Sequence, residues 1–533
     1  MKEFKLLING KDCTTGNCEY FPYADCSISD FRATRETIRD LKQGRVTANA
    51  ERIVYAKYAI GDDQTNRLAM EAAHNAFQKF RLFSVSVRIK ILNDIRKHLL
   101  RHEEEIRRLL VIEGHPDKLA RWELLGMKEG IAEETVKFYK SQMRQEVGVI
   151  GKERVYWVRK PDGVVCLEPP RNAPCSNSFT AILTFLPGNT LIVKPPLHHP
   201  LSTTYLWRNV VWEALKENGA PDGTLNIVIG NSKRLLDEWI ESPLVSDIIF
   251  FGESAKGLEI GSQIYASGKK PILELSGNDI LVVWKDADLE SAAESLCDAF
   301  LGSTQICMVP KNALVHEEVY EPFMRIVQAR VADIKAGLPS DNNTCLTPVI
   351  KIKEFYEFLE DAKNQGARII GAARRINFRH EVDAEGVFIE PTLVEIPDEQ
   401  IARRVRCIQE ETFFPLLPIC RITSEDRKGL SADGAIFKKM VSLINQNQFG
   451  LRFSLWIQSD KYLRKFVKEV DNAGLFRVNS RHVGFSLYLA THGGTRKSGG
   501  PFGEMNYMWQ KTSHLQGISR TKLYSHVSSV VRD

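Results

Sequence analysis

Residues 225–275 of the chain carry the pattern that decides the fold, LNIVIGNSKRLLDEWIESPLVSDIIFFGESAKGLEIGSQIYASGKKPILEL. Three short apolar runs, LNIVI, DIIFF and ILEL, alternate in it with two segments of helical spacing, near 232–241 and 254–266. Apolar strands that alternate with amphipathic helices are typical of a parallel sheet with helices on its faces. The stretch therefore predicts a doubly wound sheet of the nucleotide-binding type, which binds ligands at the carboxyl ends of its strands.

The alternation continues on both sides of this stretch. Upstream, the apolar runs at 164–167 and 191–193 are expected to be two more strands, with a helix near 201–217. Downstream, a second α/β unit is expected from about Ile280 to Phe476. Its predicted strands lie at 281–284, 313–315 and 368–370, and its predicted helices lie near 289–302 and 317–335.

The two ends of the chain have weaker patterns. Leu6-Leu7-Ile8-Asn9-Gly10 predicts a short strand that ends in an Asn-Gly turn. Two amphipathic helices are expected between Arg67 and Gly114, whereas residues 20–62 show no clean period. The glycine-rich tail at 493–503 suggests a loop laid over another surface.

Length and composition limit the class of protein. At 533 residues the chain exceeds the ~250–300 at which single hydrophobic cores stop growing, so we expect more than one domain. The net charge of +5, from 72 basic and 67 acidic residues, is too small to indicate nucleic acid or an anionic membrane as a partner. No apolar stretch is long enough to span a membrane, and the start lacks a signal-peptide core, so a cytoplasmic protein is expected. The ten cysteines form no Cys-x-x-Cys pair, and we expect no metal site.

Cys307 is the first candidate for chemistry. It follows Gly302-Ser303-Thr304-Gln305-Ile306, a small and polar stretch that suggests a helix end or a loop. A thiol at such a turn can be deprotonated and attack a carbonyl. The plainer interpretation, a cysteine packed in the core, is the one we accept for Cys297, and it stays open for Cys307.

Two further groups could assist such a thiol. Glu274 ends an apolar strand, where burial in a cleft would raise its pKa and let it take a proton from water or from the thiol. Asn172, in the turn PPRNAP at 169–174, could aim its amide at a developing oxyanion. Each also has a structural interpretation, because strand-end carboxylates and turn asparagines are common.

Two charged residues could bind a cofactor. Lys194 ends the strand Leu191-Ile192-Val193, and an ammonium at a strand's carboxyl end suits a ribose or a phosphate. Glu411 lies beside two aromatic residues in EETFFP at 410–415. Taken alone, both could equally be surface charges.

Seven stretches, taken in chain order, resemble the aldehyde dehydrogenase superfamily from about Leu6 to about Gly517. They are PRNAP (170–174), GNTLIVKP (188–195), FGES (251–254), LELSG (273–277), QIC (305–307), EPT (390–392) and ETFFP (411–415). The resemblance, to a divergent bacterial-type member, implies an α/β fold with a doubly wound Rossmann-type cofactor domain at 1–145 and 163–272. It also implies an α/β catalytic domain at 273–485 and a small oligomerisation β-extension at 146–162 and 486–533.

The resemblance implies a role for each candidate. Cys307 would form a thiohemiacetal with an aldehyde, from which a hydride passes to NAD or NADP, and Asn172 with the backbone amide of Cys307 would bind the oxyanion. Glu274 would activate the water that hydrolyses the thioester. Lys194 and Glu411 would hold the two riboses of the cofactor, and Phe413 would pack near the nicotinamide. Gly252 and Ser254 would begin the helix beside the pyrophosphate.

The chain departs from the family pattern at several positions. Arg171 replaces the usual aromatic residue, Ser276 stands where glycine is usual, and Glu253 replaces a small hydroxyl residue beside the pyrophosphate. Three residues after Lys194, where enzymes that prefer NAD often carry a glutamate, the chain has Leu197. Loss of that acid removes repulsion against a 2′-phosphate, so we expect a preference for NADP over NAD.

Substrate and assembly are less defined. Arg171, Arg481 and His482 could face an anionic aldehyde, although we favour ordinary surface charges. Transfer of the acyl group to coenzyme A, or reduction of an activated acid, would use the same thiol, but neither needs the base Glu274. A catalytically silent relative is a third alternative. The resemblance implies a small-molecule aldehyde as substrate and a homodimer or homotetramer.

Overall fold

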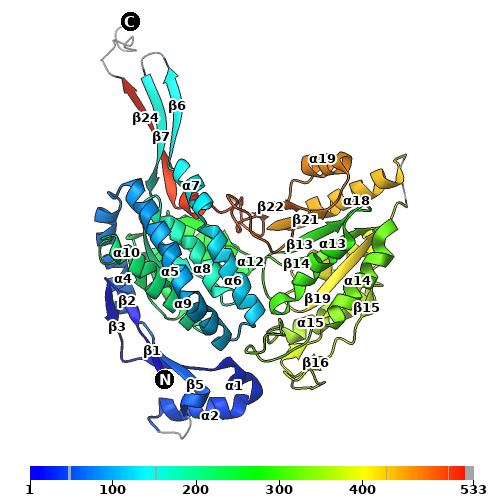
Figure 1. Cartoon of the computed structure of the whole chain (residues 1–533), viewed down its shortest axis with the longest axis horizontal. Coiled ribbons are helices and arrows are strands. Elements are labelled where there is room, and N and C mark those ends of the chain that lie inside the picture. Colours follow the sequence, from blue (N-terminus) through cyan, green and yellow to red (C-terminus); the bar gives the residue numbers. More distant parts are fainter. Residues whose placement is uncertain (46–49, 151–152, 426, 428, 502, 522–533) are drawn as a thin grey trace.

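The computed structural model describes residues 1–45, 50–150, 153–425, 427, 429–501 and 503–521, and two seven-stranded sheets dominate it (Figure 1). The first sheet has the order β12-β11-β8-β9-β10-β2-β3. Its strands are β12 (Lys270–Glu274), β11 (Val245–Phe251), β8 (Val164–Glu168), β9 (Thr190–Val193), β10 (Leu225–Ile227), β2 (Leu6–Ile8) and β3 (Lys11–Cys13). The five strands from β12 to β10 are parallel, and the β2–β3 hairpin with its Asn-Gly turn adds an antiparallel edge. The doubly wound sheet and all five of its predicted strands are confirmed.

Strand order creates a switch point between β8 and β11. The chain runs from β8 through β9 to β10 on one side, then returns to place β11 and β12 on the other side. The loops that follow β8 and β11 therefore diverge and leave a crevice at the carboxyl ends of the strands, which is where ligands bind in such sheets.

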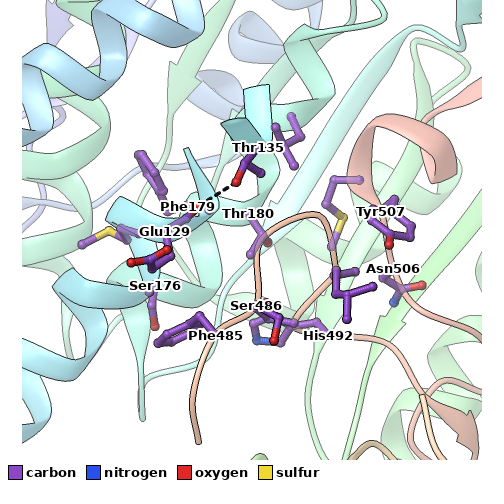
Figure 2. A pocket seen from close by; sticks show the side chains of 18 of the residues that line it. Glu129, Thr135, Ser176, Phe179, Thr180, Phe485, Ser486, His492, Asn506 and Tyr507 are labelled. Carbon is purple, nitrogen blue, oxygen red and sulfur yellow. Dashed lines mark hydrogen bonds between the residues drawn. The ribbon is translucent and has the colours of Figure 1, made fainter. Parts of the chain in front are cut away.

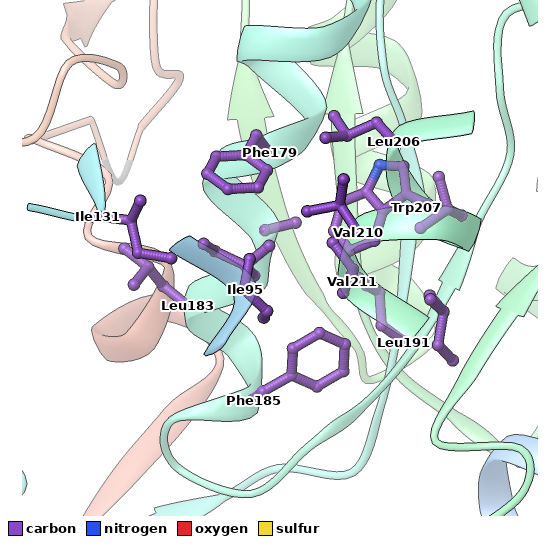
Figure 3. Close-up of a cluster of buried hydrophobic side chains, with 14 of the residues drawn as sticks. Ile95, Ile131, Phe179, Leu183, Phe185, Leu191, Leu206, Trp207, Val210 and Val211 are labelled. Carbon is purple, nitrogen blue, oxygen red and sulfur yellow. The ribbon is translucent and has the colours of Figure 1, made fainter. Parts of the chain in front are cut away.

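Helices cover both faces of this sheet and form its core. They are α4 (Asp63–Phe80), α5 (Val85–Ile112), α6 (Asp117–Gly130), α7 (Glu133–Ser141), α8 (Pro174–Phe179), η1 (Thr180–Phe185), α9 (Pro200–Tyr205), the π-helix η2 (Leu206–Trp212), α10 (Glu213–Glu217), α11 (Ser232–Glu241) and α12 (Ser254–Ala266). Figure 3 shows part of the largest core cluster, where Phe179 and Trp207 pack near Ile95 of α5. Continuous apolar strands such as β9 need cover on both faces, and these helices provide it.

The second sheet has the order β15-β18-β19-β14-β13-β21-β22 and is parallel except for its edge strand β15. Its strands are β13 (Asp279–Val283), β14 (Pro310–His316), β15 (Arg368–Ile370), β18 (Thr392–Ile396), β19 (Leu416–Ile422), β21 (Arg452–Trp456) and β22 (Leu475–Val478). Its helices are α13 (Leu289–Cys297), η3 (Asp298–Thr304), η4 (Glu317–Val319), α14 (Tyr320–Ala332), α15 (Ile352–Asn364), α16 (Glu399–Ala402), α17 (Arg406–Gln409), α18 (Ala432–Gln446) and α19 (Asp460–Glu469). The second α/β unit is therefore present, and the helix predicted at 289–302 is an α-helix that tightens into a 3₁₀ turn.

Small sheets complete the structure. The described part of residues 20–62, which showed no clean period, holds most of a three-stranded sheet and three helices: β4 (Cys18–Pro22), α1 (Ala24–Ser29), α2 (Phe31–Lys42), α3 (Ala50–Ile53) and β5 (Val54–Ala59), with β1 (Lys2–Phe4) beside β5. Helix α2 buries Thr34 and Thr37 rather than apolar residues, which explains why no apolar stripe marked it. Short pairs form between β16 (Arg375–Ile376) and β17 (Phe388–Ile389) and between β20 (Phe449–Gly450) and β23 (Thr495–Arg496), and α20 (Met508–Lys511) lies in the tail.

Three antiparallel strands project from the body as an arm (Figure 1). They are β6 (Arg144–Ile150), β7 (Glu153–Pro161) and β24 (Ser513–Thr521). Of the predicted extension at 146–162 and 486–533, residues 151–152, 502 and 522–533 lie outside the described part of the chain. Among the helices described, none is long and apolar enough to cross a bilayer.

Candidate active site

The crevice at the switch point opens into a cavity of about 200 Å³ between the two large sheets. The loop after β8 and the loop after β11 form one wall, and loops of the second sheet form the other. Six of the eight residues predicted for the site line this cavity: Asn172, Gly252, Glu274, Cys307, Glu411 and Phe413. The structure thus brings the predicted nucleophile, base and oxyanion donor together.

Cys307 follows a strained turn. Gly302, Ser303 and Thr304 all have positive φ angles, 61°, 55° and 63°, which non-glycine residues adopt only where their surroundings hold them. The Ser303 hydroxyl donates to the Thr347 carbonyl at 2.7 Å and accepts from the Thr347 amide, so a neighbouring loop holds the turn. Burial raises the pKa of Cys307 to about 12, with a smaller contribution from nearby Glu411. The thiol is therefore protonated at neutral pH and needs a base.

A buried lysine connects the loop of Cys307 with the loop of Glu411. The ammonium of Lys311 donates to the carbonyl of Thr304 at 2.7 Å and to that of Thr412 at 2.9 Å, and it lies 3.9 Å from Glu411. Glu411 in turn accepts from the Gly277 amide at 3.1 Å, and burial raises its pKa. Sequence reasoning missed Lys311, although a lysine within the apolar strand β14 is a signal, since buried charges need partners.

Glu274 ends β12 and is held by the C-terminal loop. One carboxylate oxygen accepts from the Gly493 amide and the other from the Asn506 side chain, each at 2.8 Å. Gly493 has a φ of 102°, and a Cβ there would collide with the carbonyl oxygen of Glu504, so only glycine fits. Burial raises the pKa of Glu274 to about 8, and the two hydrogen bonds oppose that shift. The glycine-rich tail is the predicted loop over another surface; Asn506 gave no signal in the sequence.

Asn172 is fixed at both its backbone and its side chain. Its amide nitrogen donates to the Gln305 carbonyl at 2.9 Å, and its own carbonyl accepts from His115 Nε2 at 3.1 Å. Buried Glu123 caps α8, which begins two residues later, by accepting from the amides of Cys175 and Ser176 at 3.0 and 2.8 Å. Because a primary amide has two N–H groups, one hydrogen of Asn172 remains for a ligand.

Lys194 and Ser254 do not line the cavity. Lys194 ends β9 and donates to Glu168 at 3.0 Å and to Ser232 at 2.6 Å. Ser254 is the first residue of α12, and its hydroxyl donates to the carbonyl of Lys497 at 2.7 Å. Leu197 is half-buried in an apolar cluster, where its carbonyl accepts from the Tyr58 hydroxyl at 3.1 Å.

The charged residues considered for an anionic substrate lie in different places. Arg171 is exposed and lines the cavity. Arg481 forms an ion pair with Asp298 at 2.6 Å, and His482 is fully buried against Ser454 and Asp279. Neither of the last two lines the cavity.

A group of possible metal ligands lies in another part of the second sheet, at His316, Glu318 and Asp433. The ammonium of Lys285 lies 2.9 Å from Asp433 and 3.6 Å from Glu318. This lysine already offsets one of the two carboxylate charges of the group.

A second, narrow pocket of about 60 Å³ adjoins the cavity (Figure 2). His492 lines the pocket and Asn177 lines the cavity, and the two side chains hydrogen-bond at 2.7 Å between them. Met308, next to Cys307, also lines the pocket. The pocket therefore reaches the residue next to Cys307.

Comparisons with known proteins identify the family of the chain. The sequence profile of the aldehyde dehydrogenase family matches residues 38–517. The chain is 28% identical to the NADP⁺ succinate-semialdehyde dehydrogenase of Escherichia coli, over 83% of this chain and 86% of that one, and 27% identical to a benzaldehyde dehydrogenase of Bacillus subtilis, over 83% and 85%. Among solved structures, an NAD-dependent aldehyde dehydrogenase from Sinorhizobium meliloti superposes with a TM-score of 0.80 at 21% identity, over 98% of this chain and 95% of that one.

The chain belongs to the aldehyde dehydrogenase family. It is an NAD(P)-dependent enzyme that oxidises an aldehyde to a carboxylic acid. The family, the fold class and the reaction predicted from the sequence are confirmed, whereas the roles of individual residues stay predictions.

Glu123→Ala is expected to lower the free energy of unfolding by about 2–3 kcal/mol, because it leaves two buried amides and the Ser176 hydroxyl without their acceptor. Urea unfolding followed by fluorescence measures the loss. Glu123→Gln, which keeps an acceptor oxygen of the same size, is the matched control and should lose less. Equal stability of the Ala variant and the unmodified protein would show that this cap contributes nothing.

Proposed function

We propose that Cys307, Glu274 and Asn172 carry out the oxidation in the cavity at the switch point. The observation that supports this most is that nucleophile, base and amide line one cavity together with Glu411 and Phe413. Glu274, with a pKa of about 8, can take the thiol proton or a water proton near neutral pH, where a catalytic base works best.

In the proposed reaction the Cys307 sulfur bonds to the aldehyde carbon as the thiol proton leaves to Glu274. The free N–H of Asn172 stabilises the oxyanion that forms. NAD(P)⁺, when bound, supplies the acceptor for the hydride. Glu274 releases the thiol proton to solvent and is ionised again. It then takes a proton from a water molecule that attacks the thioester carbon, the carbon–sulfur bond breaks, and this proton passes to the sulfur, so the carboxylic acid leaves and the Cys307 thiol is restored.

The cavity lies where a dinucleotide is expected to bind in such a sheet. It lies outside the carboxyl ends of the parallel strands, and α12 begins beside it at Ser254. Glu411 could accept from ribose hydroxyls on the nicotinamide side, and Lys194 could hold the adenosine ribose. In the described structure one oxygen of Glu168 is buried without a hydrogen-bond partner beside Lys194, which suits a ribose hydroxyl as donor.

The two hydrogen bonds that hold Glu274 disfavour transfer of the acyl group to coenzyme A. Two donors from the tail orient this carboxylate, and only hydrolysis needs a water-activating base. A silent relative is disfavoured because thiol, base and amide lie together.

Cys307→Ser is expected to reduce turnover on the order of a thousandfold or more, because the alcohol is a far weaker nucleophile. The measurement is the absorbance of reduced cofactor with a panel of aldehydes, NAD or NADP, with and without coenzyme A. Cys297→Ser, on the preceding helix, is the control and should retain activity. Turnover that survives in Cys307→Ser would overturn the mechanism, and a coenzyme A thioester product would support the alternative.

Asn506→Ala is expected to shift the rising limb of the pH–kcat profile upward by about one unit. The hydrogen bond from Asn506 stabilises the ionised form of Glu274, so removing it raises the pKa further above about 8. Glu274→Gln should abolish the limb. An unchanged limb in Asn506→Ala would mean that another group titrates.

We also propose that NADP is preferred over NAD only weakly. Leu197 removes the acid expected of an NAD enzyme, but Glu168, on the neighbouring strand end, places another carboxylate against Lys194. The sequence gives no signal for this acid, because β8 and β9 become neighbours only in the fold.

Glu168→Gln is expected to raise the ratio of kcat/KM for NADP over NAD about tenfold, because it removes repulsion against the 2′-phosphate and frees Lys194 to pair with it. Leu197→Glu should lower the same ratio. Steady-state kinetics with both cofactors measures it. If both variants leave the ratio unchanged, residues other than Glu168 and Leu197 distinguish the 2′-phosphate of NADP from the 2′-hydroxyl of NAD.

Assembly, location and domain limits also remain proposals. The arm exposes apolar side chains, with Val149 72%, Ile150 65% and Leu515 53% exposed, and such surface favours association. We propose a homodimer or homotetramer through this arm, a cytoplasmic location, and the domain limits 1–145 with 163–272 and 273–485.

A further inference from the structure

The narrow pocket beside the cavity has one acidic side chain and no lysine or arginine among the described residues that line it. The acid is Glu129, near the carboxyl end of α6. Around it the wall is largely aromatic and aliphatic, and Figure 2 shows Glu129 near Ser176 and Phe485. The aromatic residues of the wall are Trp122, Tyr139, Phe179, Phe485 and Tyr507.

The carboxylate of Glu129 has no hydrogen bond or ion pair with any residue that the structure describes, although its backbone carbonyl accepts from Thr135 at 3.1 Å. A negative charge at a helix carboxyl end is unfavourable, because the helix dipole is negative there. Half-buried among rings, such a group gains most from a cation that enters the pocket.

His492 cannot supply that cation. Burial lowers the pKa of His492 to about 3, so the ring is neutral, and its two nitrogens hydrogen-bond to Asn177 and Thr491. The pocket is therefore negative overall. An aldehyde with a carboxylate at its far end would meet Glu129 and no compensating positive charge.

We propose that this pocket selects a slender aldehyde that carries an ammonium group at its far end, which Glu129 binds. The proposal rests on the proposed function, in which Cys307 attacks the aldehyde that the pocket presents. Aromatic walls favour the same ligand, because ring faces attract cations. A pocket of about 60 Å³ admits a short unbranched chain rather than a bulky group.

Three aldehydes that differ only in their terminal group test the selection: 3-aminopropanal, butanal and succinate semialdehyde. The unmodified enzyme should have its highest kcat/KM with 3-aminopropanal and its lowest with succinate semialdehyde. In Glu129→Gln the ratio of kcat/KM for 3-aminopropanal over butanal should fall about tenfold, mostly through KM, because a charge interaction in binding is lost. Glu129→Asp should retain part of the ratio.

Glu134→Gln is the matched control. Glu134 is exposed, lies outside the pocket, and its substitution changes the net charge equally, so the ratio should be retained. A ratio that Glu129→Gln leaves unchanged would overturn the proposal, as would preference of the unmodified enzyme for succinate semialdehyde.

Binding without turnover separates this proposal from the catalytic one. Calorimetry with propylammonium chloride should detect binding to the unmodified enzyme and to Cys307→Ser, and much weaker binding to Glu129→Gln. If propylammonium binds as expected while Cys307→Ser still oxidises aldehydes, the catalytic proposal fails and the selection stands. If propylammonium binds equally to the Glu129→Gln variant, the selection fails whatever the role of Cys307.

Discussion

The structure depends on burying the carboxylate of Glu274 while leaving it able to exchange a proton in the cavity. A carboxylate buried at the end of an apolar strand is costly unless donors surround it, and here the donors come from a loop about 220 residues further along the chain. The loop must therefore return to the first sheet, and it does so through Gly493, where no side chain would fit. This one requirement ties the C-terminal tail to the switch point of the doubly wound sheet.

Lys311 has the corresponding role in the second sheet. A neutral group of the same shape could not replace its buried ammonium, because two carbonyl oxygens and the nearby Glu411 all face it. By joining the carbonyls of Thr304 and Thr412, it sets the distance between the nucleophile loop and the loop of Glu411. The positive charge also opposes the rise in the pKa of Cys307 that burial causes. Lys311 therefore contributes both to the position of the Cys307 loop and to the pKa of its thiol.

The sequence predicted those parts that repeat a local pattern. Strands such as β9 and β11 are continuous apolar runs, and the segments 232–241 and 254–266 proved to be helices with those bounds. Residues that act through distant contacts gave no such pattern: Asn506 reaches Glu274 across 232 positions, and Glu168 becomes relevant only because β8 and β9 are neighbours. Helix α2 was missed for another reason, since its buried face is made of threonines. A periodic pattern of apolar residues indicates which face of a helix or strand is buried. Polar contacts between segments that are distant in the sequence produce no such pattern.

The same tail also connects the proposed substrate pocket with the base. Within about twenty residues the chain supplies Phe485 and His492 to the pocket, and Gly493 and Asn506 to Glu274. His492 and Gly493 are adjacent, so a shift that widens the pocket moves the amide that holds the base. The hydrogen bond between His492 and Asn177 then links this segment to α8, which follows the oxyanion loop of Asn172. The wall that the tail provides therefore cannot move without moving the amide that holds the base, whereas Trp122 of α6 and Phe179 of α8 line the pocket independently of the tail.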